Sequence, residues 1–257
     1  MYIEILYNYI NFLKFRKKKI MIFAIESNSL KLTLCLLNDG KLISNFSLSF
    51  KNDLSEILIP SINNFLKKNT ITLKDISFLA IGCGPGSFTS IRTLIAAAKG
   101  IIISNKHIKS IGINSLAALA MSFIEEAKIK NIKYIVSSID SKRQEPFLQT
   151  FEIGDFQNKT KLNPTNEIKT VKVQDLKKYL FENNLHKKDV LFVGHNQKLL
   201  ANERVNLHLL ESKNQFSDAL GVAKLSYSLI SSKANITQSK ISYNKFKPLY
   251  VRFADIN

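Results

Sequence analysis

The stretch that decides the fold runs from Gly82 to Arg92 and reads GCGPGSFTSIR. The apolar run 76–81 that precedes it predicts a buried strand, and the glycines and the proline predict a sharp turn. Ser87 is placed to begin a helix, because its hydroxyl can accept a hydrogen bond from a free backbone N–H of the first turn. The sequence therefore predicts a strand, a turn and a helix in direct succession.

The helix after this turn has two unlike apolar faces. At about 100° per residue, one broad stripe of mostly large residues should pack on the sheet; it comprises Phe88, Ile91, Leu94, Ile95, Ala98, Ile101 and Ile102. A second stripe holds only small residues, namely Thr89, Thr93, Ala96, Ala97 and Gly100. A polar line of Arg92 and Lys99 separates the two stripes. A flat face of small side chains lets another helix come close, so this face is a candidate docking surface.

The same loop also invites a phosphate interpretation, because free N–H groups at a helix N-terminus favour an anion. Gly84, Gly86 and Ser87 are the loop candidates, together with Glu26 at the end of the first strand. The loop lacks the lysine of a P-loop and the spacing of a dinucleotide fingerprint. The sequence therefore favours a structural turn over a phosphate site.

Catalytic and metal-binding patterns are sparse. The four histidines and two cysteines show no metal-type spacing. Asp140 stands at a predicted strand end, where with Glu145 it could serve acid–base chemistry or could cap a turn. We predict no catalytic residue and no metal site.

Composition bounds the class of protein. The chain has 257 residues, 45% of them hydrophobic, which suits one large domain or two small ones. The net charge of +17 favours a polyanion such as RNA, although the joint excess of Lys, Ile and Asn is also typical of an AT-rich genome. Two cysteines without a disulfide framework indicate reduced thiols and a cytoplasmic protein.

Residues 1–20 differ from the rest of the chain. Their apolar part is interrupted by polar residues and is too short to span a bilayer, so we expect no membrane association. A basic surface helix, a helix docked on the domain and a mis-assigned start all remain open. We favour the last, because a clean strand begins at Met21.

From Met21 the apolar pattern predicts the order β-β-β-α-β-α. The strands are expected at 21–26, 32–37, 42–50 and 76–82, and the helices at 54–66 and 88–100. The third strand should be half-buried through Leu42, Phe46, Leu48 and Phe50. Asp53 with Glu56 suggests a capping box.

A second block follows from about residue 108. We expect strands at 108–113, 133–139, 147–151 and 190–193, and helices at 115–127, 173–185 and 218–230. Ser217 should cap the last helix. Residues 154–170 look polar and irregular.

Five segments together resemble the TsaB (YeaZ) family: 21–28, 84–92, 111–120, 139–145 and 248–252. The most specific is GPGSFTSIR at 84–92, which is close to the family signature G-P-G-S-F-T-G-[LV]-R. The resemblance implies an α/β protein with an actin-like ATPase (ASKHA, ribonuclease H-like) fold and two βββαβα-type lobes. Residues 21–107 with about 215–257 would form the first, partner-binding lobe, and 108–214 the second.

The resemblance also implies a function. Family members pair with TsaD, which makes the threonylcarbamoyl modification on the adenosine beside the anticodon of tRNA. The chain would then be the non-catalytic subunit of a TsaB–TsaD heterodimer that recruits the ATPase TsaE and acts on tRNA. Without TsaD it would form homodimers through the same surface. No cofactor would be bound tightly, and ATP or ADP would be held in the assembled complex.

In such a pair, contact would be made by the first-lobe helices. The implied residues are Leu54, Ile57, Leu58, Thr89, Arg92, Thr93, Ala96, Ala97 and Gly100. The H-x-x-x-H by which TsaD relatives hold a metal matches Ser115 and Leu119, which cannot bind a metal together. This argues against the alternative, a stand-alone actin-like-fold kinase or a metallopeptidase-like hydrolase.

Overall fold

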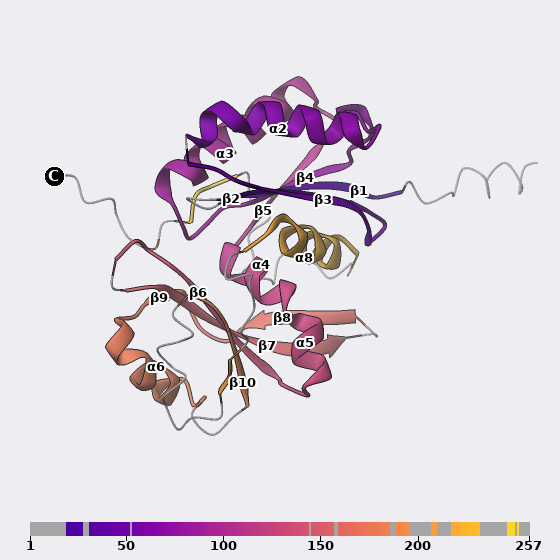
Figure 1. Ribbon diagram of the computed structural model, residues 1–257. Helices are drawn as coiled ribbons and strands as arrows, with labels where there is room; N and C mark the ends of the chain where they lie inside the picture. Colours follow the sequence, from indigo (N-terminus) through magenta and orange to yellow (C-terminus); the bar gives the residue numbers. More distant parts are fainter. Residues whose placement is uncertain are drawn as a thin grey trace, which may run out of the picture.

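Two β-sheets lie one above the other in the computed structural model, with helices between them and on the outer faces (Figure 1). The structure describes residues 19–27, 31–51, 53–143, 145–156, 159–185, 189–195, 207–209, 217–231, 246–249 and 251. Most of residues 1–20 and part of the closing segment 248–252 lie outside these ranges. No helix in the described ranges is both long enough and apolar enough to cross a membrane.

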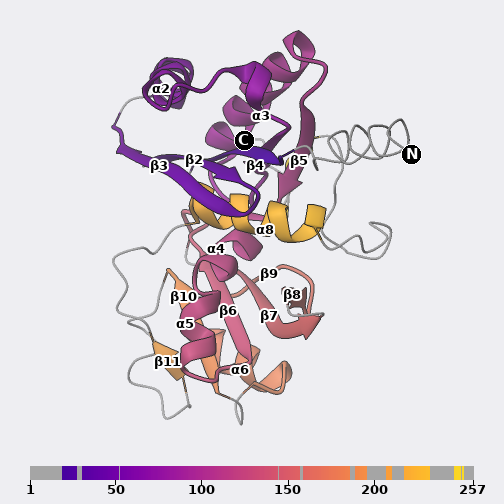
Figure 2. The same cartoon turned by 90° about the vertical axis from the view of Figure 1, so that its right-hand side faces the viewer.

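The first sheet has the strand order β3-β2-β1-β4-β5. Its strands are β1 Met21–Ser27, β2 Lys31–Asn38, β3 Lys41–Ser49, β4 Phe78–Gly82 and β5 Lys109–Ile113. Helices α2 (Leu54–Lys68) and α3 (Phe88–Ser104) cover its outer face, and α8 (Ala219–Ser231) covers its inner face (Figure 2). A short 3-10 helix, η1 (Leu73–Asp75), joins α2 to β4.

The second sheet repeats this order. It runs β11-β10-β6-β7-β8, with β9 beside β7. Its strands are β6 Tyr134–Ile139, β7 Phe147–Phe156, β8 Lys159–Pro164, β9 Lys169–Thr170, β10 Val190–Gly194 and β11 Leu207–Leu209. In both sheets the third strand of the unit is outermost, and it is followed by the second, first, fourth and fifth. Two βββαβα-type units are therefore present, although the residues show no repeat.

The helices between the sheets are exchanged. Helix α4 (Ser115–Ser122) follows the first sheet in the chain but packs on β6 and β7, whereas α8 follows the second sheet but packs on β1 and β2. The two helices also pack on each other. A Cβ atom on Gly221 would lie 2.2 Å from the carbonyl oxygen of Ala118, so this approach requires glycine. Each lobe thus completes its core with a helix attached to the other lobe.

The boundary expected at residue 108 is wrong. Strand β5 pairs in parallel with β4, so the chain up to Ile113 belongs to the first sheet. The helix expected at 115–127 is divided at Phe123 into α4 and α5 (Ile124–Ile129). Helix α6 (Leu176–Glu182) is shorter than expected and follows a 3-10 turn, η2 (Val173–Asp175).

Residues 154–170 are not irregular. Strand β7 continues to Phe156 and pairs with β8, and β9 then returns beside the start of β7. The hairpin lies at the edge of the second sheet, where few apolar residues are needed. Among the described side chains of residues 154–170, only Leu162 is buried in the core, so the alternating signal was too short to detect.

The third strand is more exposed than expected. Strand β3 is the outer strand of the first sheet, and Leu42 and Phe46 are 49% and 37% exposed. The register shifts between Leu36 and Leu37, so one β3 residue is unpaired. Because partners in a ladder share a face, this bulge places Leu42 with Leu37 on the inner face and Phe46 with Leu34 on the outer face.

Local capping follows the expectation at one helix and departs from it at two. Ser87 caps α3, as expected, by accepting a hydrogen bond from the N–H of Ser90. Asp53 precedes α2 but its side chain makes no capping bond. Asp218, not Ser217, caps α8, because its carboxylate accepts from the N–H of Gly221 at 2.8 Å.

Two helical glycines should respond oppositely to alanine. Gly221→Ala should destabilise the protein by about 1–3 kcal/mol, because its methyl group meets the backbone of α4. Gly100→Ala should stabilise it by roughly 0.5–1 kcal/mol, because a Cβ there meets nothing within 4 Å and glycine is a poor helix former. Denaturant unfolding of both variants measures the difference, and equal effects would contradict the close packing of α4 and α8.

Candidate functional site

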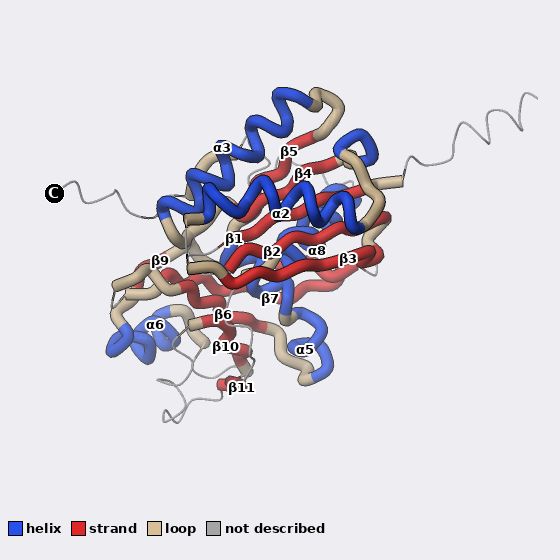
Figure 3. Tube along the Cα trace, turned by 45° about the horizontal axis from the view of Figure 1, so that its top comes forward, coloured by secondary structure: helices blue, strands red, loops and turns tan. Residues whose placement is uncertain are grey.

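The outer face of the first lobe is formed by α2 and α3, which cross the sheet together (Figure 3). The small residues of α3 are outside the core: Thr89, Ala96 and Gly100 are exposed, and Thr93 and Ala97 are half-buried. Exposed apolar side chains flank them, with Ile59 of α2 44% and Ile103 of α3 74% exposed. This face has the flat, weakly polar character that helix docking needs.

Two residues expected to contact a partner are instead in the core. Leu54 and Leu58 of α2 are 5% and 1% exposed and pack under the helix, so they cannot reach a partner. Ile57 is half-buried at the edge of the same helix. Leu54 and Leu58 belong to the apolar stripe of α2 that repeats every 3.6 residues. This stripe is the buried face of the helix, because its most apolar side packs on the sheet.

Phe88 also departs from the expected pattern. It is 39% exposed, and the Arg92 guanidinium carbon lies 3.7 Å from the centre of its ring. Ser90 takes a buried place and donates from its hydroxyl to Ser87 Oγ at 3.0 Å. As the first residue of α3, Phe88 points back over the helix N-terminus.

A cavity of about 360 Å³ lies at that N-terminus, between the lobes. Gly86, Ser87 and Phe88 line it from the first lobe, and the second lobe contributes the turn 139–143 with His195. Burial lowers the pKa of His195. Of the four candidates for nucleotide contact, only Gly86 and Ser87 face this space.

Asp140 caps the turn beside this cavity. Its Oδ1 accepts from the N–H of Lys142 at 2.9 Å, and its Oδ2 lies 3.6 Å from the Lys142 ammonium. Its own N–H donates to Nδ1 of His195. Glu145 does not line the cavity. The structure therefore favours the turn-capping interpretation over an acid–base pair.

Glu26 is buried at the end of β1 and is 3% exposed. Its carboxylate accepts from the N–H of Ser27 at 3.0 Å and from the hydroxyl of Ser115 at 2.9 Å. Ser217 makes a further hydrogen bond to it. A Cβ on Gly82 would lie 2.0 Å from Oε2, so glycine provides the space. Burial, opposed by these hydrogen bonds, raises the pKa of Glu26 to about 7.

Ser115 extends this network to the glycine turn. The N–H of Gly84 donates to Ser115 Oγ at 3.2 Å, and the carbonyl of Gly84 accepts from the N–H of Ser115 at 2.8 Å. Gly84, with φ +95°, thus bonds through both its N–H and its carbonyl to the first residue of α4. One residue of the glycine loop is a structural joint between β4 and α4.

Two of the four nucleotide candidates are engaged in bonds within the protein. Glu26 and Gly84 make hydrogen bonds to Ser115. Leu119 packs closely against Gly194, since a Cβ atom on that glycine would lie 2.9 Å from the Leu119 side chain. Among the described residues, no group of three or more His, Cys, Asp or Glu side chains could hold a metal ion. Cys35 and Cys83 are buried, which raises the pKa of each thiol to about 12.

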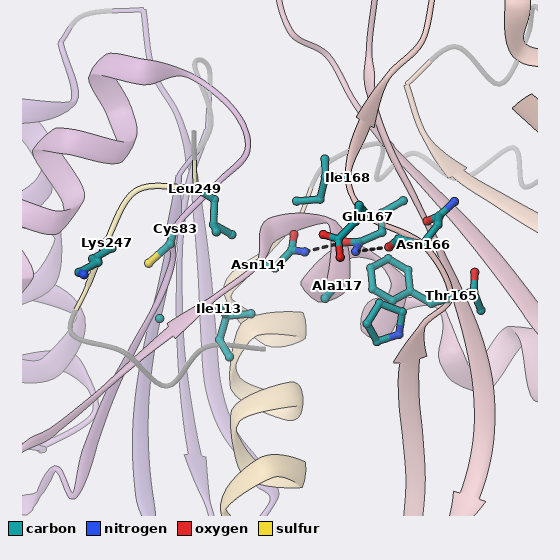
Figure 4. A pocket seen from close by; sticks show the side chains of 14 residues that line it. Cys83, Ile113, Asn114, Ala117, Thr165, Asn166, Glu167, Ile168, Lys247 and Leu249 are labelled. Carbon is teal, nitrogen blue, oxygen red and sulfur yellow. Dashed lines mark hydrogen bonds between the residues drawn. The ribbon is translucent and has the colours of Figure 1, made fainter. Parts of the chain in front are cut away.

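A larger cavity of about 410 Å³ is lined by residues of both lobes and was not predicted from the sequence (Figure 4). The first lobe contributes Asn114 and the second contributes Gln149, whose side chains are joined by a 2.7 Å hydrogen bond. Gln149 also donates to the carbonyl of Asn166 at 3.0 Å. The β8–β9 loop that completes this cavity lies in the region expected to be irregular, so no local pattern linked it to α4.

Two lobes of the same strand order, joined by exchanged helices, define a two-lobed protein of the actin-like ATPase fold. Solved structures of this class are similar to the chain. YeaZ from Pseudomonas aeruginosa matches with a TM-score of 0.62 and 16% identity, covering 80% of this chain and 90% of that one. An inorganic polyphosphate/ATP-glucomannokinase from Arthrobacter sp. strain KM matches with a TM-score of 0.50 and 10% identity, covering 82% and 99%. At these identities the likeness shows the fold alone.

A protein-family model described as TsaD, tRNA N6-adenosine threonylcarbamoyltransferase, matches residues 42–252. The chain belongs to this family, and its similarities place it in the TsaB (YeaZ) group.

Two curated relatives carry the name tRNA threonylcarbamoyladenosine biosynthesis protein TsaB. The one from Escherichia coli K12 is 33% identical over 99 residues, which are 38% of this chain and 42% of the relative. The one from Buchnera aphidicola subsp. Schizaphis graminum is 35% identical over 98 residues, 38% and 46%. The chain thus spans less than half the length of these two relatives.

The Glu26 network predicts a pH dependence of stability. Because the folded pKa of about 7 exceeds the ordinary glutamate value of 4.5, the folded state holds the extra proton, and stability falls as pH rises through this window. Each pKa unit corresponds to about 1.4 kcal/mol. Glu26→Gln removes the titrating carboxyl group and should flatten this dependence. The stability of the variant relative to wild type should therefore be higher at about pH 8 than at about pH 5.

Denaturant unfolding across the pH range measures this effect, with the exposed Glu56→Gln as the matched control. The control should keep the wild-type pH profile. Parallel profiles for Glu26→Gln and wild type would contradict a raised pKa at Glu26.

Proposed function

We propose that this chain is the non-catalytic partner of a TsaD-type subunit in making N6-threonylcarbamoyladenosine in tRNA. The observation that carries the proposal is that Ser115 and Leu119 both make contacts within the protein. Ser115 donates to the buried Glu26, and Leu119 packs beside Gly194. Where a catalytic relative would hold a metal, this chain has a packed joint between its lobes.

The small-residue face of α3 is the proposed docking seam. Small side chains let helix axes approach to about 8 Å, and Thr89, Ala96 and Gly100 offer no bulky side chain. Arg92, beside this seam, carries its charge over Phe88 and can reach a partner at the rim. A homodimer would use the same face, so it would compete with the TsaD-type partner.

The remaining partners follow from the same proposal. The assembled pair would recruit a TsaE-type ATPase and would act on tRNA in the cytoplasm. Any ATP or ADP would be held only in the assembled complex, since Glu26 and Gly84 are engaged in hydrogen bonds within this chain. A stand-alone kinase or hydrolase is the competing function, and steady ATP or peptide turnover by the purified chain would support it.

The experiment that tests the proposal is reconstitution. The chain should co-purify with a TsaD-type subunit, and the pair with a TsaE-type ATPase should form threonylcarbamoyladenosine in a tRNA transcript. Omitting the chain should abolish product. Full modification without it would overturn the proposal.

The seam itself can be tested by one charge. Ala96→Arg places a long cation on the exposed face and should weaken binding of the TsaD-type subunit by about tenfold or more, equivalent to about 1.4 kcal/mol. Phe181→Arg is the control, because Phe181 is 64% exposed on α6 of the other lobe. Isothermal titration calorimetry measures the affinity of each variant for the TsaD-type subunit. Equal affinities for the two variants would contradict docking on the α3 face.

A further inference from the structure

Six lysines gather at the end of the first lobe where α2 and α3 finish. They are Lys19, Lys67, Lys68, Lys74, Lys106 and Lys109, and all are exposed. We name this set the lysine cluster. Figure 3 shows the ends of α2 and α3 and the start of β5 at the same side of the lobe.

Backbone contacts bring these segments together. The N–H of Ile71 donates to the carbonyl of Leu66, which folds the chain after α2 back on its last turn. The His107 ring nitrogen Nε2 lies 3.1 Å from the carbonyl oxygen of Leu73. This contact joins the residue after Lys106 to the residue before Lys74. Ser77 connects the other two lysines, since its carbonyl accepts from the N–H of Lys109 and its hydroxyl lies 3.5 Å from the carbonyl oxygen of Lys19.

The cluster has little negative charge of its own. Within the described ranges, none of the six lysines forms an ion pair with a carboxylate. The acids nearest along these contacts are Asp39 and Asp75. Asp75 is held by two hydrogen bonds from Thr72, which lower its pKa. In the second lobe, by contrast, Lys130 and Lys178 pair with glutamates of their own helices.

Helix stabilisation accounts for only part of this arrangement. Lys67 and Lys68 stand in the last turn of α2, where cations offset the helix dipole. Lys106 and Lys109 have no such position, and Lys74 lies in the three-residue η1. Lys109 places its ammonium 5.7 Å from the centre of the Phe78 ring, which still leaves it exposed. Codon bias would add lysines across the whole surface, whereas this set gathers at one end of the first lobe.

We propose that the lysine cluster binds the phosphodiester backbone of RNA. The lysines come from several elements and line neither of the two cleft cavities, so a small anion would meet only one or two of them. An extended polyanion can contact many at once and gain from the release of its counterions. The cluster also lies away from the cavities of the cleft, at the opposite ends of β4 and β5, so it stays accessible when the cleft is filled.

The choice of tRNA as the RNA rests on the proposed function. Lysines act here as point charges without base contacts, so the cluster would add affinity and not sequence recognition. It lies at the far end of the α3 seam from Ser87, past Gly100. An RNA held there would run beside a partner docked on that seam.

The test replaces the five lysines of the cluster between residues 67 and 109 by glutamine: Lys67→Gln, Lys68→Gln, Lys74→Gln, Lys106→Gln and Lys109→Gln. A control removes five exposed lysines from the second lobe: Lys133→Gln, Lys161→Gln, Lys169→Gln, Lys172→Gln and Lys177→Gln. Both variants lower the net charge by five, from +17 to +12. Thermal denaturation checks that both fold.

Fluorescence anisotropy with a labelled tRNA transcript gives the affinity of the full chain at about 50 to about 200 mM salt. The cluster variant should bind about tenfold or more weakly, and its log–log salt slope should fall by roughly two to four. The control should stay near wild type. A set of Lys→Arg replacements at the same five positions should keep the affinity.

Three results would overturn the proposal. The two glutamine variants could weaken equally, which would assign binding to net charge; wild type could show no salt-dependent tRNA affinity; or the cluster could control binding to anionic phosphatidylserine vesicles and not to tRNA. Co-purification of the cluster variant with the TsaD-type subunit separates the two proposals. Retained pairing with unchanged tRNA affinity refutes only the RNA surface, whereas a wild-type chain that does not pair refutes the proposed function.

Discussion

The close crossing of α8 over α4 is the contact on which the two-lobed structure depends. Gly221 brings one helix backbone against the carbonyl of Ala118 in the other, and a side chain at that position would separate them. Since each helix fills the core of the lobe opposite to the one it follows, the crossing fixes both sheets at once. The cleft, its cavities and the Glu26 network all lie around this contact. Their geometry therefore depends on this packing constraint.

The Glu26 network explains how a buried acid is accommodated at the end of β1. An acid at the end of β1 is costly to bury, and three hydroxyl and amide donors from Ser27, Ser115 and Ser217 offset part of that cost. Gly82 leaves the room that the carboxylate needs. Glu26 therefore acts as an internal support that joins β1 to Ser115 and Ser217.

Much of this structure could be predicted from the sequence where the deciding contacts are local. Ser87 caps α3 through a neighbour in the next turn, and the strands of the first sheet follow their apolar runs. The family signature then supplied the fold class, which the strand order confirms.

Features set by distant pairing could not be predicted. Ser217 is drawn to Glu26, far away in the chain, and leaves the capping of α8 to Asp218. The assignment of β5 to the first sheet depends on its pairing with β4. The resemblance implied a partner contact for Leu54 and Leu58, which the sheet side of α2 buries. The role of the α3 face is a prediction that only a partner can test.

The bulge in β3 bears on how the protein avoids self-association through its sheets. An outer strand with Leu42, Ile43 and Phe46 exposed is a template on which another extended chain could add. The extra residue opposite Leu36 and Leu37 interrupts the even ladder spacing that such a template requires, and Lys41 sets a charge at its start. A single inserted residue thus disfavours the addition of another strand at the β3 edge.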